Sequence, residues 1–487
     1  MSFAESSFII KNDGTLWGCG YNGWAGTLGL GDTSGRKIFT QITTNVDDIK
    51  SVYGGYDYTI ILKNDSTLWG CGRNNNSQLG LGDTDQRTLF TQITDNVKSA
   101  YCGYEHTIIL KNDNTLWGCG WNSCGQLGLG DTSNRSTFTK IATNTNDIKS
   151  VCCGDEHTII LKNDGTLWGC GDNTHGELGL EDIHSTNRFK MINTNPGNIK
   201  SIHCGDSHTL ILQNDGMLWG CGKNSSGELG LGDTNDRHIF TKITNNVKSA
   251  CCGNNHTFII KNDGTLWACG LNNHNQLGLG DNTNRTAFTQ ITTNADNVKS
   301  VYCELNHTLI LKKDGTLWTC GYNYYSELGL GDSSSRATFT QVITNTDNIK
   351  SLMNDYPALP SVIKIYDTKI GYVETLDTNN FRNIPVNSVE RLKSLCINPL
   401  NTHLNCLISF DQKQTWKAFN GTNWTTISDI SLENIIVNGM EVNGLNSLDK
   451  SKLISGGFVG DLDFKVVMKT NDTSKTPSIT KIYIEYK

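Results

Sequence analysis

The sequence predicts an all-β protein: a seven-bladed β-propeller of four-stranded blades, followed by a C-terminal β-sandwich. One motif with a central tryptophan recurs seven times, at intervals of 52, 48, 51, 51, 48 and 51 residues. Each copy holds short runs rich in β-branched and apolar residues, and none shows the periodicity of a helix. The repeated unit is therefore a propeller blade. The tryptophans are Trp17, Trp69, Trp117, Trp168, Trp219, Trp267 and Trp318.

The third copy shows the strands expected in one blade. Residues 106–110 and 115–120 are two β-prone runs joined by Lys-Asn-Asp-Asn, and several other copies end this turn with Gly. Asn-Asp-Gly between such runs favours a tight hairpin, because Asn and Gly tolerate positive φ. A glycine-rich loop follows, and then the third and fourth runs at 138–141 and 148–152. Such a unit cannot bury its own apolar face, so we expect a closed ring with tryptophans such as Trp168 in the blade cores.

Three motifs give the repeat a family resemblance. They are Cys-Gly-x-x-His-Thr, Asn-Asp-Gly-x-Leu-Trp-x-x-Gly and Gln-Leu-Gly-Leu-Gly-Asp, as at 102–107, 163–171 and 126–131. Over roughly residues 1–355 the chain resembles the repeats of the regulator of chromosome condensation family, which implies a seven-bladed propeller. The resemblance does not imply one activity. The family's scaffold serves nucleotide exchange factors, light sensors, ubiquitin ligases and bacterial surface proteins.

The repeat pattern ends near residue 355, where a Pro-bearing break separates residues 1–355 from a second domain, residues 356–487. Alternating runs such as 404–410 and 464–468 predict antiparallel strands that pack as a β-sandwich. This part resembles β-sandwich modules of tail and tail-fibre proteins from phages of low-GC Gram-positive bacteria. The Asn, Lys and Ile bias of the chain agrees with such a genome.

Charge and hydropathy narrow the classes of function. The formal net charge is −7 and the pI about 5.9, so no basic field is expected to hold nucleic acid. No segment has the roughly 18 apolar residues of a spanning helix, and the N-terminus lacks the pattern of a secretory signal. We therefore expect no membrane insertion, and synthesis in the cytoplasm without a signal peptide. The 17 cysteines are interpreted as buried free thiols of a protein folded under reducing conditions.

Three repeated polar features are interpreted as structure. The cysteines recur once per blade and lack the paired spacing of zinc ligands. The Asp and Arg of Gly-Asp-x-x-x-Arg, such as Asp83 with Arg87, are expected to form an ion pair inside their loop. Five histidines precede a Thr at the start of a strand, where an imidazole can bond a neighbouring turn: His106, His157, His208, His256 and His307. No metal site, cofactor or catalytic residue is predicted.

Positions that differ between copies are the candidates for a binding site. One variable zone is the pair of residues before each His-Thr, and the other is the loop after the tryptophan strand. Copies one and seven become neighbours when the ring closes, so their loop aromatics should form one exposed patch, a usual platform for sugars or proteins. We treat the two zones as alternative binding faces of the propeller. The acidic residues of the first zone would favour a basic partner. The candidate binding residues are Tyr21, Trp24, Tyr322, Tyr324, Tyr325, Trp121, Tyr56 and Tyr104.

The favoured function is a non-enzymatic receptor-binding or baseplate-associated component of a virion or phage-tail-like particle. The propeller would recognise a bacterial cell-surface glycan or protein, and residues 356–487 would dock to other particle proteins. A homo-oligomer is compatible with this function. The alternative is an intracellular interaction scaffold or a regulator resembling guanine-nucleotide exchange factors, although repeats of 48–52 residues leave no room for an inserted wedge. A glycoside-active enzyme would need paired carboxylates, and nothing marks Asp155, Glu156 and Asp206 as catalytic.

Overall fold

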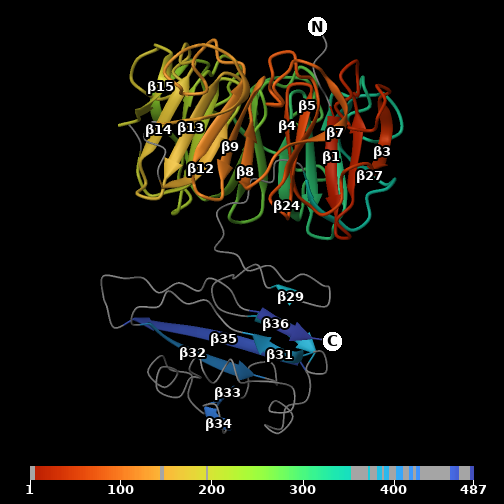
Figure 1. Ribbon diagram of the computed structural model, residues 1–487, viewed down its shortest axis with the longest axis vertical. Helices are drawn as coiled ribbons and strands as arrows, with labels where there is room; N and C mark the ends of the chain where they lie inside the picture. The colour runs from red at the N-terminus through yellow and green to blue at the C-terminus, as the bar shows by residue number, and fades with distance from the viewer. Residues whose placement is uncertain are drawn as a thin grey trace. The chain divides into compact units, whose positions relative to one another are not determined.

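The first part of the chain forms a closed ring of seven antiparallel four-stranded sheets (Figure 1). The computed structural model describes residues 6–142, 147–193 and 196–352 in full and, beyond residue 352, the backbone of eight strands. The chain divides into two compact units, Met1–Ala358 and Leu359–Lys487. The sequence predicts this boundary between residues 355 and 356. The predicted seven-bladed all-β propeller is confirmed, and the described residues contain no helix.

Each blade runs from an inner strand to an outer strand at the rim. The first strands of consecutive blades approach one another, which places them at the axis of the ring. Blade 1 contains β28 (Ile349–Leu352), β1 (Ser6–Lys11), β2 (Leu16–Gly20) and β3 (Arg36–Ile42). Blade 2 contains β4 (Ile49–Gly55), β5 (Tyr58–Lys63), β6 (Leu68–Gly72) and β7 (Arg87–Thr94). Blade 3 contains β8 (Val97–Cys102), β9 (His106–Lys111), β10 (Leu116–Gly120) and β11 (Arg135–Lys140).

The remaining four blades repeat this order from the axis outward. Blade 4 contains β12 (Ile148–Cys153), β13 (His157–Lys162), β14 (Leu167–Gly171) and β15 (Thr186–Met191). Blade 5 contains β16 (Ile199–Cys204), β17 (His208–Gln213), β18 (Leu218–Gly222) and β19 (Arg237–Thr244). Blade 6 contains β20 (Val247–Cys252), β21 (His256–Lys261), β22 (Leu266–Gly270) and β23 (Arg285–Gln290). Blade 7 contains β24 (Val298–Cys303), β25 (His307–Lys312), β26 (Leu317–Gly321) and β27 (Arg336–Val342).

The ring closes because the sequence repeat and the blade are offset by one strand. The fourth run of each repeat becomes the inner strand of the next blade, so the last run, β28, completes blade 1 beside β1. In this ladder Ile9 pairs with Leu352 and Lys11 with Ile349. Figure 1 labels β1 and β3 of blade 1, and Ile38 of β3 forms a bridge with Leu330 in the loop of blade 7. Main-chain hydrogen bonds thus join the two ends of the propeller.

A glycine–phenylalanine contact recurs at every blade interface. The loop after the third strand holds a glycine with positive φ, and the outer-strand phenylalanine of the next blade fills the space that a side chain would take. A Cβ on Gly278 would lie 2.8 Å from the ring of Phe339, and one on Gly329 would lie 2.7 Å from Phe39. Blade 7 therefore packs on blade 1 as blade 6 packs on blade 7.

The repeat tryptophans are not the buried anchors that the sequence suggests. Trp168 is half-buried, whereas Leu167 before it is fully buried. One side of its indole packs on the apolar core, and the Lys162 ammonium lies over the ring, 4.8 Å from the centroid. The indole N–H donates to the Thr166 hydroxyl at 3.1 Å. A lysine covers the outer side of this indole, so replacing Trp168 removes less buried area than expected.

The second unit contains two antiparallel sheets among its described strands. The three-stranded sheet has the order β29 (Gly371–Tyr372), β36 (Tyr483–Tyr486) and β31 (Val389–Lys393). The five-stranded sheet has the order β30 (Phe381–Pro385), β35 (Asp461–Thr470), β32 (Thr402–Ser409), β33 (Trp416–Phe419) and β34 (Trp424–Ile427). The packing that would make them a β-sandwich lies outside the described residues, so the sandwich stays a prediction.

Ring closure can be tested with a matched pair of core substitutions. Phe39 and Phe339 are both fully buried in equivalent contacts, Phe39 at the closing interface and Phe339 between blades 6 and 7. Phe39→Ala and Phe339→Ala should each lower the free energy of unfolding by about 3–5 kcal/mol, because each leaves a cavity of the same shape. Chemical denaturation of both variants measures this. A much smaller loss for Phe39→Ala would mean that blade 7 does not pack on blade 1.

Candidate binding face

Both variable zones of the repeat lie at the same end of the ring. The residue after the third strand donates its backbone N–H to the carbonyl of the residue before the second strand: Trp121 to Glu105 at 2.8 Å, and Tyr322 to Asn306 at 2.9 Å. The two strands are antiparallel partners, so the start of one meets the end of the other. The expectation of two alternative faces is therefore wrong. We call this end the loop face, and the opposite end, with the Asn-Asp-Gly turns, the hairpin face.

Aromatic side chains from blades 1 and 7 form a continuous cluster on the loop face. The Tyr21 ring lies 4.9 Å from that of Tyr325, which lies 5.0 Å from Tyr324. Tyr324 in turn stacks at 6.3 Å on Tyr322. Tyr324 is 65% exposed, and Trp24, in the same loop as Tyr21, is 52% exposed. Ring closure thus brings together aromatics that are about 300 residues apart in the sequence.

The other predicted aromatics lie in blades 2 and 3. The rings of Tyr56 and Tyr104 stack with centroids 4.1 Å apart, and the Arg73 guanidinium lies 5.2 Å from the Tyr56 centroid. Arg73 also forms an ion pair with Glu105 at 2.7 Å. Trp121 is half-buried, and its indole nitrogen has no hydrogen-bond partner among the described residues. The eight predicted residues therefore fall into one cluster of four tyrosines, one stacked pair and two separate tryptophans.

An acidic pocket of about 520 Å³ opens on the same face. Its walls come from blades 3 to 7 and include five carboxylates but no lysine or arginine. His274 connects the pocket to the aromatic cluster, since its ring lies 4.9 Å from that of Tyr322. The pocket is lined by Tyr104, Asp155, Glu156, Asp172, Glu177, Asp206, Ser207, Asn254, Asn255, His274, Leu305 and Asn306.

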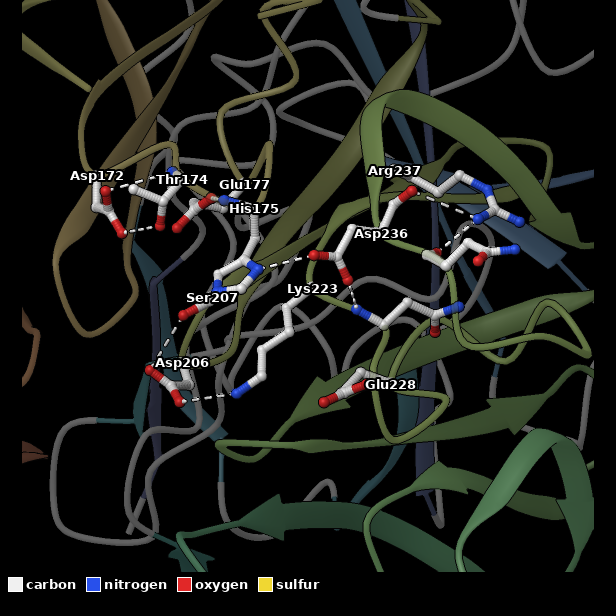
Figure 2. A network of polar contacts seen from close by, with 12 residues as sticks. Asp172, Thr174, His175, Glu177, Asp206, Ser207, Lys223, Glu228, Asp236 and Arg237 are labelled. Carbon is white, nitrogen blue, oxygen red and sulfur yellow. Dashed lines mark hydrogen bonds and ion pairs between the residues drawn. The ribbon is translucent and has the colours of Figure 1, made fainter. Parts of the chain in front are cut away.

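The polar groups around this pocket are only partly neutralised. Figure 2 shows Lys223 pointing at Asp206, with 4.0 Å between ammonium and carboxylate, and His175 Nδ1 2.7 Å from the Asp236 carboxylate. Burial raises the pKa of Asp155, and the neighbouring Asp206 raises it further. Burial also raises the pKa of Glu177 to about 8. A basic side chain entering the pocket would favour the charged forms of these carboxyl groups and would bond to them directly.

The sequence predicts this pocket only in part. It groups Asp155, Glu156 and Asp206, which precede the second strands of blades 4 and 5. It does not show that Asp172 and Glu177, from the loop of blade 4, join them. Asp172 holds the position of Tyr21 in the first copy, so the variability of that position was the available signal.

Beneath the loop face, the repeated histidines form bonds between blades. His256 Nε2 lies 3.3 Å from the Thr308 hydroxyl of the next blade, and that hydroxyl donates to the Gln276 carbonyl at 2.9 Å. The hydroxyl hydrogen is therefore committed, and Nε2 must carry the imidazole proton. Burial lowers the pKa of His256 to about 3, so the ring is neutral. The structural interpretation of these histidines is confirmed, with equivalent contacts at His106, His157, His208 and His307.

The other repeated polar residues also act in the scaffold. Asp83 and Arg87 form the predicted ion pair at 2.6 Å, and five other copies form the same pair. The third-strand cysteines are buried and unpaired, and the Cys170 thiol donates to the Gln126 carbonyl of the preceding blade at 3.4 Å. Across the part of the chain that the structure describes, no group of three or more His, Cys, Asp or Glu is placed to hold a metal ion. Within the same residues, no helix long and apolar enough to span a membrane is found.

The geometry defines a class, the seven-bladed β-propellers built from an internal repeat, and the comparisons define the family. Residues 91–355, more than half of the chain, match the RCC1-like domain, and residues 49–78 and 65–110 match the regulator of chromosome condensation (RCC1) repeat. The chain therefore belongs to the RCC1-like domain family.

Relatives and solved structures show how far this similarity reaches. The X-linked retinitis pigmentosa GTPase regulator of Mus musculus is 33% identical over 39% of this chain and 15% of its own length. The ultraviolet-B receptor UVR8 of Arabidopsis thaliana is 28% identical over 38% of this chain and 32% of its own. Prp20p from Saccharomyces cerevisiae superposes with a TM-score of 0.61 at 18% identity, covering 77% of this chain and 94% of that one. Human WBSCR16 gives 0.60 at 21% identity, covering 70% and 95%. At these identities the solved structures share the fold alone.

The histidine contacts predict a specific dependence of stability on pH. The pKa of histidine is about 6.5 in the unfolded chain, and that of His256 in the fold is about 3. The contribution of His256 to the free energy of unfolding is therefore fully present above pH 6.5 and is lost as the pH falls. Below pH 6.5 it decreases by roughly 1.4 kcal/mol per pH unit. His256→Gln keeps an N–H donor for Thr308 but does not titrate. The difference in unfolding free energy between wild type and variant should therefore shift by about 2 kcal/mol, in favour of the variant, between pH 7.5 and pH 5.

Urea denaturation of both proteins at the two pH values measures this shift. The carboxylates of the acidic pocket titrate in wild type and variant alike, so their contribution cancels in the difference. A difference that stays constant across the range would show that His256 is not held neutral by the fold.

Proposed function

We propose that this chain is a non-enzymatic protein-binding scaffold and that the loop face of the propeller is its recognition surface. The observation that carries this proposal is the presence, on one face, of the aromatic cluster and the acidic pocket, joined through His274 and Tyr322. Both are built mainly from positions that vary between copies. The positions that repeat are used in the contacts between blades.

The chemistry of the face indicates the kind of partner. Tyr324 and Trp24 expose large aromatic surfaces, and such residues contribute most of the binding energy in many protein interfaces. The adjoining pocket offers carboxylates to a lysine or arginine side chain. A partner that fits both surfaces presents apolar residues to the aromatic cluster and, close to them, a lysine or arginine to the acidic pocket. This pairing supports a protein partner over a purely carbohydrate ligand.

The relatives support the same general function. One is named a GTPase regulator, and Prp20p is described as having binding properties toward Gsp1p and histones. These descriptions make a GTPase or a basic protein the first partners to test for this chain, whose similarity covers only part of the mouse and plant relatives. Nucleotide exchange itself would be a further step that the loop face alone does not require.

The tail-particle hypothesis gains no support from the family or from these relatives. It depends on a resemblance in residues 356–487, where the structure describes only strand backbones, and so does the docking to other particle proteins. A cell-surface glycan as ligand depends on the aromatic cluster alone. Synthesis in a reducing cytoplasm stays part of the proposal, supported by the fifteen unpaired cysteines among the described residues.

The proposal predicts that partner binding depends on the aromatic cluster. Affinity capture from the source cells with quantitative mass spectrometry, followed by titration of the purified partner, compares wild type with Tyr324→Ala/Tyr325→Ala. The double variant should lose affinity by a factor of roughly 30 or more, because two aromatic anchors are removed. Met191→Ala removes an exposed apolar side chain from an outer strand and should bind like wild type.

Two outcomes would contradict the proposal. If the double variant and Asp155→Asn/Asp206→Asn both bind the partner like wild type, the loop face is not the recognition surface. If a glycan array, but no protein, distinguishes wild type from the double variant, the ligand is a carbohydrate.

A further inference from the structure

The hairpin face carries a ring of lysines around the axis. Every inner strand begins with Ile or Val, then Lys, then Ser, so one register position on seven neighbouring strands is a lysine. Neighbouring inner strands approach one another, which gathers these ammonium groups near the centre of the face. The lysines are Lys50, Lys98, Lys149, Lys200, Lys248, Lys299 and Lys350.

Several of these charges are not neutralised by carboxylates. Lys248 and Lys299 form no side-chain hydrogen bond or ion pair with the described residues, and their side chains are open to solvent. Burial lowers the pKa of Lys149 and Lys200, as expected for cations held among neutral groups. Four lysines bond neutral acceptors. They are Lys50 with the Lys98 carbonyl at 3.1 Å, Lys98 with the Asn114 side chain at 3.0 Å, Lys149 with the Ile199 carbonyl at 2.9 Å, and Lys200 with the Lys248 carbonyl at 2.8 Å.

Two of the ring lysines also line a pocket of about 700 Å³ between blades 7 and 1. Lys299 and Lys350 form its axial side, and another side is formed by Lys312, the last residue of β25, and Lys313, in the turn that follows. Four lysines thus converge on one open cavity at the hairpin face. The ring extends the positive field from this cavity toward the axis of the propeller.

The two acids in the pocket wall form no ion pair with Lys299 or Lys313. Asp314 accepts hydrogen bonds from the Thr316 backbone and hydroxyl, at 2.9 and 2.7 Å. Asp347 pairs with Lys11 at 2.9 Å. Lys312 pairs with Asp296, also at 2.9 Å, so its charge is partly compensated. Lys299 and Lys313 form no ion pair with a described carboxylate, so both ammonium groups remain available to an anion.

Lys313 departs from the repeat: the other six copies have asparagine at this position of the turn. In blade 4 the equivalent residue, Asn163, donates from its side chain to Asp147 at 2.6 Å, and three other blades form the same kind of bond. Lys313 forgoes this bond, and its side chain forms none with the described residues. A free cation has therefore replaced a structural amide in one blade. The six asparagines are Asn12, Asn64, Asn112, Asn163, Asn214 and Asn262.

We propose that the pocket between blades 7 and 1 on the hairpin face binds a small soluble polyphosphate, a molecule with three or more linked phosphate groups. A single phosphate fills only part of a 700 Å³ cavity, whereas a linked series can meet Lys299 and Lys313 of blade 7 and still extend toward blade 1. Lysine suits this task, because its ammonium is a point charge on a flexible stem and follows phosphate without a fixed geometry. The site lies on the face opposite the proposed protein-binding surface and does not depend on it.

Isothermal titration calorimetry on the full chain, with sodium tripolyphosphate and separately with orthophosphate, tests this site. Tripolyphosphate should bind at least roughly tenfold more tightly than orthophosphate, with an affinity that falls as salt is added. Lys313→Asn restores the residue of the other six blades and so should fold, yet it should weaken tripolyphosphate binding by roughly fivefold or more. Lys299→Gln should do the same.

The matched control is Lys242→Asn on the outer strand β19, which makes the same charge change far from the pocket and should leave affinity within about twofold. Tyr324→Ala/Tyr325→Ala should bind tripolyphosphate like wild type. An equal loss in Lys242→Asn would show that only the overall charge attracts the anion, and would overturn the proposal. Equal affinity for orthophosphate, or no measurable binding by wild type, would overturn it as well.

Discussion

The closed ring depends on a hydroxyl that bonds in two directions, found with a histidine at five of the seven blade interfaces. Thr209 donates to the Glu177 carbonyl at 2.7 Å and accepts from His157 Nε2 at 3.0 Å, and both partners belong to the preceding blade. Two contacts to one atom fix the angle between blades as well as their separation. The last interface uses Ser7 in place of threonine, 2.8 Å both from His307 Nε2 and from the Glu327 carbonyl. The same rotation from each blade to the next therefore brings blade 7 back against blade 1.

The contacts between blades use repeated positions, and this explains why the loop face and the hairpin face differ. Histidines, threonines, cysteines and glycines at repeated positions join the blades, and they leave little freedom to vary. The loops above them can change one copy at a time, as Tyr21 and Asp172 do at equivalent positions. At the hairpin face the turns are nearly uniform, and a single change, Asn to Lys313, is enough to distinguish one interface from the others. Function can thus be added locally without altering the angle between blades.

The sequence predicts the parts of this structure that follow from repetition. The spacing of the tryptophans gives seven blades, and the adjacency of copies one and seven predicts the contact of Tyr21 with Tyr325. It does not predict how deeply Trp168 is buried, because strand periodicity gives the face of a sheet and not what covers it. The lysine ring and the pocket beside Lys313 depend on the one-strand offset between repeat and blade, which no single copy reveals. The β-sandwich stays a prediction.

The offset that closes the ring also determines how the propeller carries mechanical load. β28 is the last strand of the propeller, so the chain leaves the ring from the strand that completes blade 1. Tension on the second unit falls first on the short ladder between β28 and β1, whereas the other six inner strands are held at both ends by the chain. The ring therefore has one defined opening point under force, and it lies where the two ends of the propeller meet.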